Sequence, residues 1–127
     1  MINVVILQGR LTADPELKTT QAGKLVCSFR VAVQRKKYSD DPPLADFFEI
    51  VTWSALAEFV SHNFRKGDQI GIEGNLRENK FTDRDGRNRT YTNVTAINVH
   101  FIGGKRRYET YPDDDPFDET NFLWGEK

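Results

Sequence analysis

The sequence contains a single cysteine, Cys27, which excludes a disulfide framework and a cysteine-rich zinc site. Its two histidines, His62 and His100, share no ligand-like spacing with each other or with Cys27, so neither a metal site nor a Cys–His nucleophile is indicated. No apolar run approaches the ~20 residues of a membrane-spanning helix, and the N-terminus lacks a charged segment followed by an apolar one. These absences predict a soluble cytoplasmic protein without metal, cofactor or membrane segment.

The net charge of −1 conceals two parts of opposite sign. Residues 1–107 carry 17 Lys and Arg against 12 Asp and Glu, a balance of +5, whereas residues 108–127 carry one Lys and seven acids, a balance of −6. A basic body suits a polyanion, and an acidic tail can shield that body or bind a basic partner. A solvated tail on an ordinary domain is the alternative.

Apolar and polar residues alternate along most of the first hundred positions, which indicates half-buried β-strands. The first predicted strand is apolar on both faces at its start, so we expect the core to cover one face and another subunit to cover the other. In the fourth predicted strand, residues 69–81, the side chains of Ile70, Ile72 and Leu76 are expected to point inward, and Gly71 and Gly74 permit a bend. Asp85-Gly86 marks a hairpin tip. The predicted strands cover residues 2–11, 24–34, 47–53, 69–81 and 89–101.

A helix is predicted after the third strand, with Ser54 as its N-cap and Gly67 as its stop. Its apolar stripe consists of Leu56, Phe59, Val60 and Phe64. Five antiparallel strands with one helix between the third and fourth are typical of an all-β oligonucleotide/oligosaccharide-binding (OB-fold) barrel, and an unrelated small β-barrel is the alternative. We expect this barrel over residues 1–103 and a short, acidic, flexible tail over residues 104–127.

No set of side chains indicates an active site. Cys27 lies on the apolar face of its strand, which favours a buried, inert thiol. Asp83 and Asp85 are spaced for a turn rather than for paired acid–base chemistry. Gly71 and Gly74 lie inside a strand instead of before a helix, so they form no phosphate loop. Binding without catalysis is therefore the expected function.

Aromatic residues stand beside cations, a pattern suited to single-stranded nucleic acid because rings stack on bases and cations bind phosphates. Phe47 and Trp53 share one face of their strand, opposite a predicted core set of Phe48, Ile50 and Thr52. Core packing is the alternative for the rings, and a solvated surface is the alternative for each cation. The candidate stacking residues are Phe47, Trp53, Phe81 and Tyr38; the candidate phosphate-binding residues are Arg35, Lys36, Lys37, Arg77, Lys80, Arg84 and Arg87.

Four segments, residues 9–17, 45–53, 65–77 and 80–86, resemble the bacterial single-stranded DNA-binding protein family. The resemblance covers about residues 1–102 and keeps the family's motif order. It implies an OB-fold protein, usually a homotetramer although a dimer is possible, that coats single-stranded DNA non-specifically in replication, recombination and repair. It also implies a nucleoid-associated protein of a bacterium or a phage-infected bacterium. The family's stacking aromatics map onto Phe47, Trp53 and Phe81, and more loosely onto Tyr38.

The chain departs from the family pattern at two places. Glu49 stands between the stacking aromatics, where some members carry a basic or neutral polar residue. The family's acidic tip, which ends the chain in Pro-Phe and docks replication and repair proteins, resembles residues 113–117 (Asp113, Asp114, Asp115, Pro116 and Phe117), but ten residues follow it here. Residues 122–124 offer a second apolar anchor.

Two other classes remain as alternatives. One is a protein-interaction module of the same fold, such as a replication-restart or recombination accessory factor with weak DNA binding. The other is an OB-fold nuclease, which would need acid or histidine clusters that the sequence lacks. The exposed aromatic and cationic set favours DNA coating over both.

Overall fold

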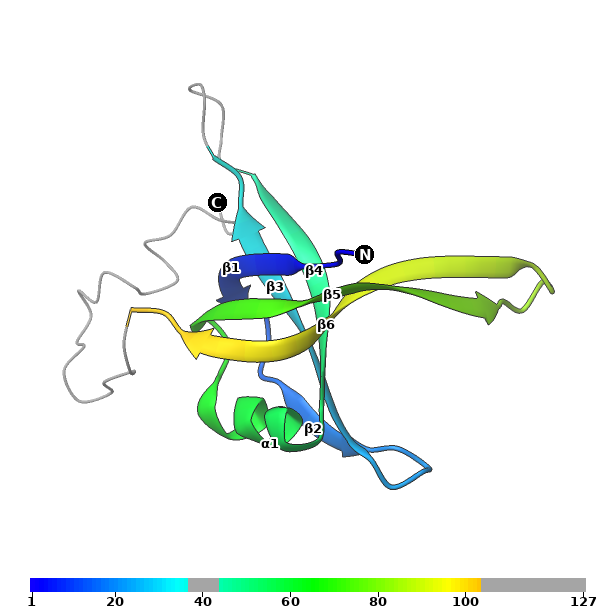
Figure 1. The fold of residues 1–127 in the computed structure, drawn as a ribbon, viewed down its shortest axis with the longest axis horizontal. Coiled ribbons are helices and arrows are strands. Elements are labelled where there is room, and N and C mark those ends of the chain that lie inside the picture. The colour runs from blue at the N-terminus through cyan, green and yellow to red at the C-terminus, as the bar shows by residue number, and fades with distance from the viewer. Residues whose placement is uncertain (37–43, 104–127) are drawn as a thin grey trace.

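The computed structural model describes residues 1–36 and 44–103 as a small β-barrel with one helix at its side (Figure 1). The order along the sheet is β1-β5-β6-β4-β3-β2, and an additional pairing of β1 with β3 closes the barrel. This architecture confirms the OB-fold prediction. The elements are β1 (Val5–Leu11), β2 (Glu16–Thr19), β3 (Leu25–Gln34), β4 (Ala45–Trp53), α1 (Ser54–Asn63), β5 (Gln69–Thr82) and β6 (Asn88–Phe101).

Two details of the sheet differ from the sequence prediction. A short extra strand, β2, pairs antiparallel with the first half of β3. Within the barrel, β4 pairs parallel with β6, at Ile50–Val94 and Val51–Thr95, so the strands are not all antiparallel. The reason is topological: α1 and β5 intervene between these two strands, so they run in the same direction where they meet.

The helix begins and ends differently from the prediction. Trp53 occupies the N-cap position without a side-chain capping bond, and Ser54, the predicted N-cap, is the first helical residue with φ +57°. The helix ends at Asn63, before Gly67, because Phe64 adopts an extended conformation. This turns the Phe64 ring into the core, where it stacks on Phe101 with ring centroids 5.0 Å apart. Among the described residues, no helix is long and apolar enough to span a membrane.

The barrel interior contains the apolar face that the alternation predicts, with Cys27, Ile50, Ile70 and Ile72 at most 1% exposed. Two predicted core residues are not buried: Phe48 is 39% and Leu76 is 50% exposed. Phe48 lies on a part of β4 that pairs only with β3, beyond the reach of β6. Leu76 follows an irregularity between Glu73 and Gly74, where β5 leaves the barrel.

The two glycines of β5 offer a test of this bend. A Cβ at Gly74 would collide with the backbone carbonyl of Thr95, whereas a Cβ at Gly71 would meet nothing closer than the flexible end of the Ile102 side chain, at 3.1 Å. We expect Gly74→Ala to lower the free energy of unfolding by roughly 1–3 kcal/mol, because backbone atoms would have to shift. Gly71→Ala is the matched control and should cost much less. Urea denaturation measures both, and equal stability of the two variants would contradict the close approach at Gly74.

The first strand leaves one apolar side uncovered. Val5 and Leu7 are partly buried against the core, whereas Val4 and Ile6 are 66% and 73% exposed. The two-sided apolarity seen in the sequence thus corresponds to a covered face and an uncovered face.

Candidate nucleic-acid interface

Four strands present one hollowed face, which we call the central groove. It has a volume of about 350 Å³ and receives side chains from β3, β4, β5 and β6. Strand alternation explains this set, because the register brings alternate residues of each strand to the same side. The lining residues are Val26, Ser28, Glu49, Val51, Trp53, Arg77, Asn79, Tyr91, Asn93 and Thr95.

Two predicted stacking residues lie on this side of β4. Trp53 lines the groove and is 41% exposed, and Phe47 is 46% exposed on the same side of the strand, roughly 20 Å further along. The Arg30 guanidinium lies over the Phe47 ring, 5.5 Å from its centroid. Because both rings are substantially exposed, neither belongs to the core, and both are available for stacking.

Beyond Arg77, β5 and β6 pair only with each other and project from the barrel as a two-stranded arm, residues 78–92 (Figure 1). Phe81, the third predicted stacking residue, is 46% exposed on this arm. Its ring meets Tyr91 edge to face, with centroids 5.8 Å apart. Tyr91 also lines the central groove, so it connects the arm to the groove.

Tyr91 was missed in the sequence, although a signal was present. Counting outward from the hairpin tip pairs Phe81 with Arg89 and Asn79 with Tyr91. This register places Tyr91 diagonally beside Phe81 on one face of the arm.

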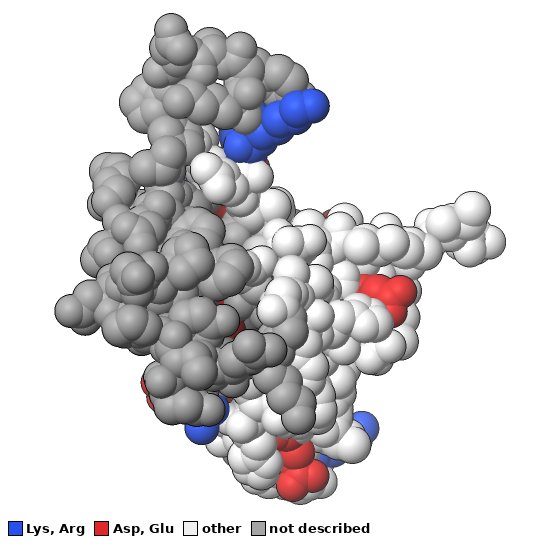
Figure 2. All heavy atoms as spheres, turned by 90° about the vertical axis from the view of Figure 1, so that its left-hand side faces the viewer, with Lys and Arg blue, Asp and Glu red and all other residues white. Residues whose placement is uncertain are grey.

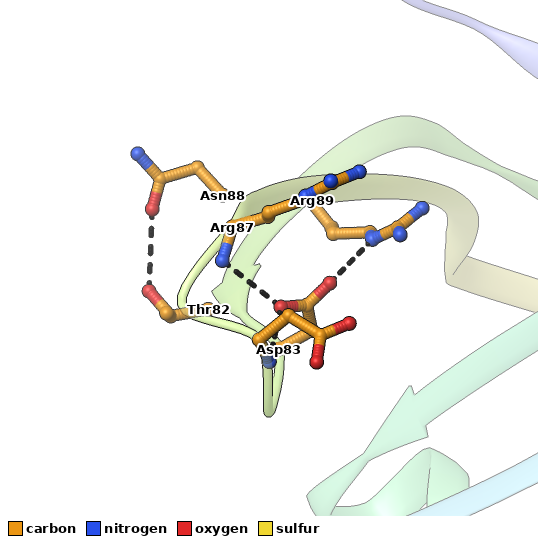
Figure 3. A network of polar contacts seen from close by, with 6 residues as sticks. Thr82, Asp83, Arg87, Asn88 and Arg89 are labelled. Atoms are coloured by element: carbon orange, nitrogen blue, oxygen red, sulfur yellow. Dashed lines mark hydrogen bonds and ion pairs between the residues drawn. The ribbon is translucent and has the colours of Figure 1, made fainter.

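The tip of the arm is tied together by Asp83 (Figure 3). Its carboxylate accepts hydrogen bonds from the backbone N–H of Asp85 and Arg87 and from Arg89 Nε, the last at 2.7 Å. Thr82 Oγ1 and Asn88 Oδ1 meet 3.3 Å apart at the base of the tip. The hydrogen bond from Arg89, aided by those from the backbone, lowers the pKa of Asp83.

The lowered pKa predicts an acid-sensitive tip. A carboxyl group whose pKa is depressed on folding adds stability above its unfolded pKa of about 4, and this stability is lost as the pH falls through the folded value. We expect the amide protons of Asp85 and Arg87 to exchange faster with solvent as the pH falls through this range, after correction for intrinsic rates. In Asp83→Asn they should exchange fast at neutral pH as well. Persistent protection in the variant would contradict the role of Asp83.

The predicted cations occupy different surroundings. Arg77 lines the central groove, whereas Lys80 lies on the opposite face of β5 by strand alternation. Arg84 and Arg87 belong to the tip of the arm. Lys36 lies just after β3 and is exposed. Lys37 and Tyr38, like residues 113–117 and 122–124 of the tail, lie outside the described residues.

Arg35 is already paired in the described structure. Its Nε and Nη2 atoms donate to the two carboxylate oxygens of Asp46 at 2.9 and 2.8 Å. This pair raises the pKa of Arg35 and lowers that of Asp46, chiefly through the hydrogen bonds. A phosphate would therefore have to compete with Asp46 for Arg35.

A second hollow of about 340 Å³ continues the central groove toward β2, since both are lined by Val26 and Ser28. Its lining adds two cations that the sequence analysis did not single out, Lys18 and Arg30, and two acids, Asp14 and Glu16. On the side of the molecule away from the arm, the visible charged side chains of the described residues are few and scattered (Figure 2). The central groove, the second hollow and the arm together form the candidate surface, because Val26 and Ser28 line both hollows and Tyr91 joins the groove to the arm.

The described residues show no group of three His, Cys, Asp or Glu side chains that could hold a metal ion. Cys27 is buried, and this burial raises the pKa of its thiol, which disfavours the reactive thiolate.

Comparison with known proteins gives a consistent result. The model of the Single-strand binding protein family matches residues 2–102. A "Single-stranded DNA-binding protein" of Treponema pallidum (strain Nichols) is 39% identical over 104 residues, which cover 80% of this chain and 58% of that relative. A protein of the same name from Staphylococcus aureus (strain MRSA252) is 37% identical over 114 residues, covering 89% and 73%. The chain thus spans less than two thirds of the Treponema relative's length.

Proposed function

The chain belongs to the single-strand binding protein family, and from this premise we propose that it coats single-stranded DNA in a sequence-independent manner, without catalysis. The observation that carries the proposal is the exposure of Phe47, Trp53 and Phe81 on the hollowed sheet and its arm. Every nucleobase offers a face for stacking, so such a surface binds single strands of any sequence. Protection of single strands during replication, recombination and repair follows from this activity, in the cytoplasm of a bacterium or a phage-infected bacterium.

The cations supply the second half of the interaction. Arg77 lines the groove, and Arg84 and Arg87 belong to the tip of the arm that carries Phe81. We propose that they bind phosphates, together with Arg35, Lys36 and Lys37 near the end of β3. Lys80, on the other face of the arm, reaches a phosphate only where the DNA passes around the arm.

Tryptophan fluorescence tests the proposal directly. Trp53 lines the groove, and the second tryptophan, Trp124, is removed by a Trp124→Phe substitution so that the signal reports on the groove alone. An unstructured oligonucleotide should quench Trp53, and a duplex of equal length should quench it far less, because stacking needs free base faces. Absence of quenching by single strands would favour the alternative function, a protein-interaction module with weak DNA binding.

We propose that the chain assembles as a homotetramer, with a dimer as the alternative. Support comes from Val4 and Ile6, which leave an apolar stripe uncovered beside β1. Exposed apolar side chains in a contiguous patch favour association. Light scattering during gel filtration measures the mass, and a monomer at micromolar concentration would contradict the proposal.

The proposed tail, residues 104–127, includes a segment with a balance of −6, which should compete with DNA for the basic body. We expect deletion of residues 108–127 to raise DNA affinity, most clearly at low salt, where screening is weak. Replacing Asp113, Asp114 and Asp115 with Asn should reproduce part of the gain. A truncated protein that binds no more tightly at low salt would show that the tail stays away from the DNA-binding face.

The tail is also the proposed docking segment for replication and repair proteins, through Asp113, Asp114, Asp115, Pro116 and Phe117. Phe117→Ala separates docking from charge, since it removes the ring and leaves the net charge unchanged. Loss of partner binding with unchanged DNA affinity is the expected result.

A further inference from the structure

One negative charge lies in the lining of the central groove. Glu49 is on β4 between Phe47 and Trp53, and its side chain lines the central groove. Phosphates are repelled by a carboxylate, so Glu49 contributes nothing to the electrostatic attraction of a polyanion. A carboxylate in this position is instead suited to a ligand group that donates hydrogen bonds.

Two asparagine amides lie in a row beside the Glu49 carboxylate. Its Oε1 accepts a hydrogen bond from Asn93 Nδ2 at 3.5 Å, and Asn93 Oδ1 accepts one from Asn79 Nδ2 at 3.1 Å. A carboxylate only accepts hydrogen bonds, so it fixes which way the amide of Asn93 points, and this in turn fixes that of Asn79. Asn93 is 8% exposed and forms the floor of the groove.

Most of the accepting capacity of Glu49 faces solvent and is not taken up by other groups of the described residues. Within residues 1–36 and 44–103, Asn93 is its only hydrogen-bonding partner, whereas a carboxylate offers about four lone-pair sites. Among the described residues, no ion pair joins it to its cross-strand neighbour Arg30, whose guanidinium lies over the Phe47 ring. The Asn79 oxygen is a further acceptor, since its nitrogen is directed at Asn93.

The groove therefore presents acceptors where a base edge would arrive. Trp53 and Tyr91 offer rings for the faces of bases, and Arg77 offers a cation for the phosphates. Cytosine, adenine and guanine each carry an exocyclic amine that donates hydrogen bonds. The one donor of thymine, its N3–H, lies between two carbonyl oxygens that a carboxylate repels. Unstacked bases in single strands are read on these edges.

We propose that Glu49 is a specificity-determining residue, which accepts a hydrogen bond from the exocyclic amine of a base and so disfavours thymine in the central groove. The inference rests on the proposed single-stranded DNA binding and adds a base preference to it. The stacking and phosphate contacts remain independent of sequence, so the preference is confined to the nucleotide that occupies this groove.

The test compares binding to oligo(dC) and oligo(dT) of equal length at pH 8, where cytosine is neutral. The readout is the ratio of the two association constants, measured for the native chain and for Glu49→Gln. The dC/dT ratio of the native chain is then compared with the dC/dT ratio of Glu49→Gln. This comparison removes the intrinsic differences in stacking and flexibility between the two oligonucleotides. Gln offers an N–H donor that suits the thymine oxygen, so the dC/dT ratio should fall by at least about fivefold.

Glu78→Gln is the matched control, since Glu78 lies two residues before Lys80 on the face of β5 that points away from the groove. It removes the same charge and should raise both affinities without changing the ratio. An unchanged ratio in Glu49→Gln, or an equal change in Glu78→Gln, would overturn the inference while leaving DNA binding intact. Absence of binding to both oligonucleotides by the native chain would instead overturn the proposed function.

Discussion

A Phe81→Ala variant is expected to bind single-stranded DNA about 1–3 kcal/mol more weakly than the native chain, because one stacked base loses its ring. The loss should be similar for oligonucleotides of different sequence, since stacking does not read base edges. Phe81 suits this test because it is 46% exposed on the arm and contributes nothing to the barrel core. Fluorescence titration of Trp53 provides the measurement.

Adding Trp53→Ala to this variant should weaken DNA binding further. The additional loss of binding free energy should be roughly the same again if the two rings stack on different bases. The double variant lacks Trp53, so its affinity is measured by the anisotropy of a labelled oligonucleotide. Phe48→Ala is the matched control: Phe48 is 39% exposed on the opposite face of β4 from Phe47 and Trp53. Equal weakening by Phe48→Ala would show that the losses reflect stability rather than stacking.

Salt should have the second large effect. If about six of the proposed cations each neutralise one phosphate, log K falls with log salt at a slope of about −4, which is roughly a 300-fold loss of affinity between 50 and 200 mM salt. The reason is release of counterions from the single strand when cations replace them. Titrations at several salt concentrations give the slope.

Single substitutions then identify which of the proposed cations contact phosphates. Arg77→Ala should reduce the slope by about 0.7, because this side chain lines the central groove. Lys80→Ala removes the same charge from the opposite face of the arm, so its slope reports whether the DNA passes around the arm. An unchanged slope in Arg77→Ala would contradict a phosphate contact in the groove.

The aromatic residues show how far alternation along a single strand can be carried. Phe47 and Trp53 were correctly placed on one face, because their spacing of six residues fixes their relative orientation on any regular strand. Phe81 was correctly placed away from Ile70 and Ile72. Tyr91 was missed, because its neighbourhood depends on the register between β5 and β6.

Alternation failed where a strand leaves the barrel. Leu76 and Phe48 have the apolar character of core residues, but their parts of β5 and β4 extend beyond the strands that would cover them. The prediction of Ser54 as the N-cap was also wrong, because strand β4 runs directly into the helix. Trp53 ends β4 and caps the helix at once, so the helix starts without a capping side chain.

The sequence by itself determined the five main strands and the single helix in their order along the chain. It also determined the buried side of each regular strand and the three exposed rings, because periodicity and turn residues act over short distances along the chain. Only the tertiary structure decided the parallel pairing of β4 with β6, the second hollow beside β2 and the amide chain that links Glu49, Asn93 and Asn79. These features join residues up to 44 positions apart, and their geometry depends on strand register and barrel closure. Neither leaves a trace in local residue patterns, which is why the groove could be assembled only from the folded chain.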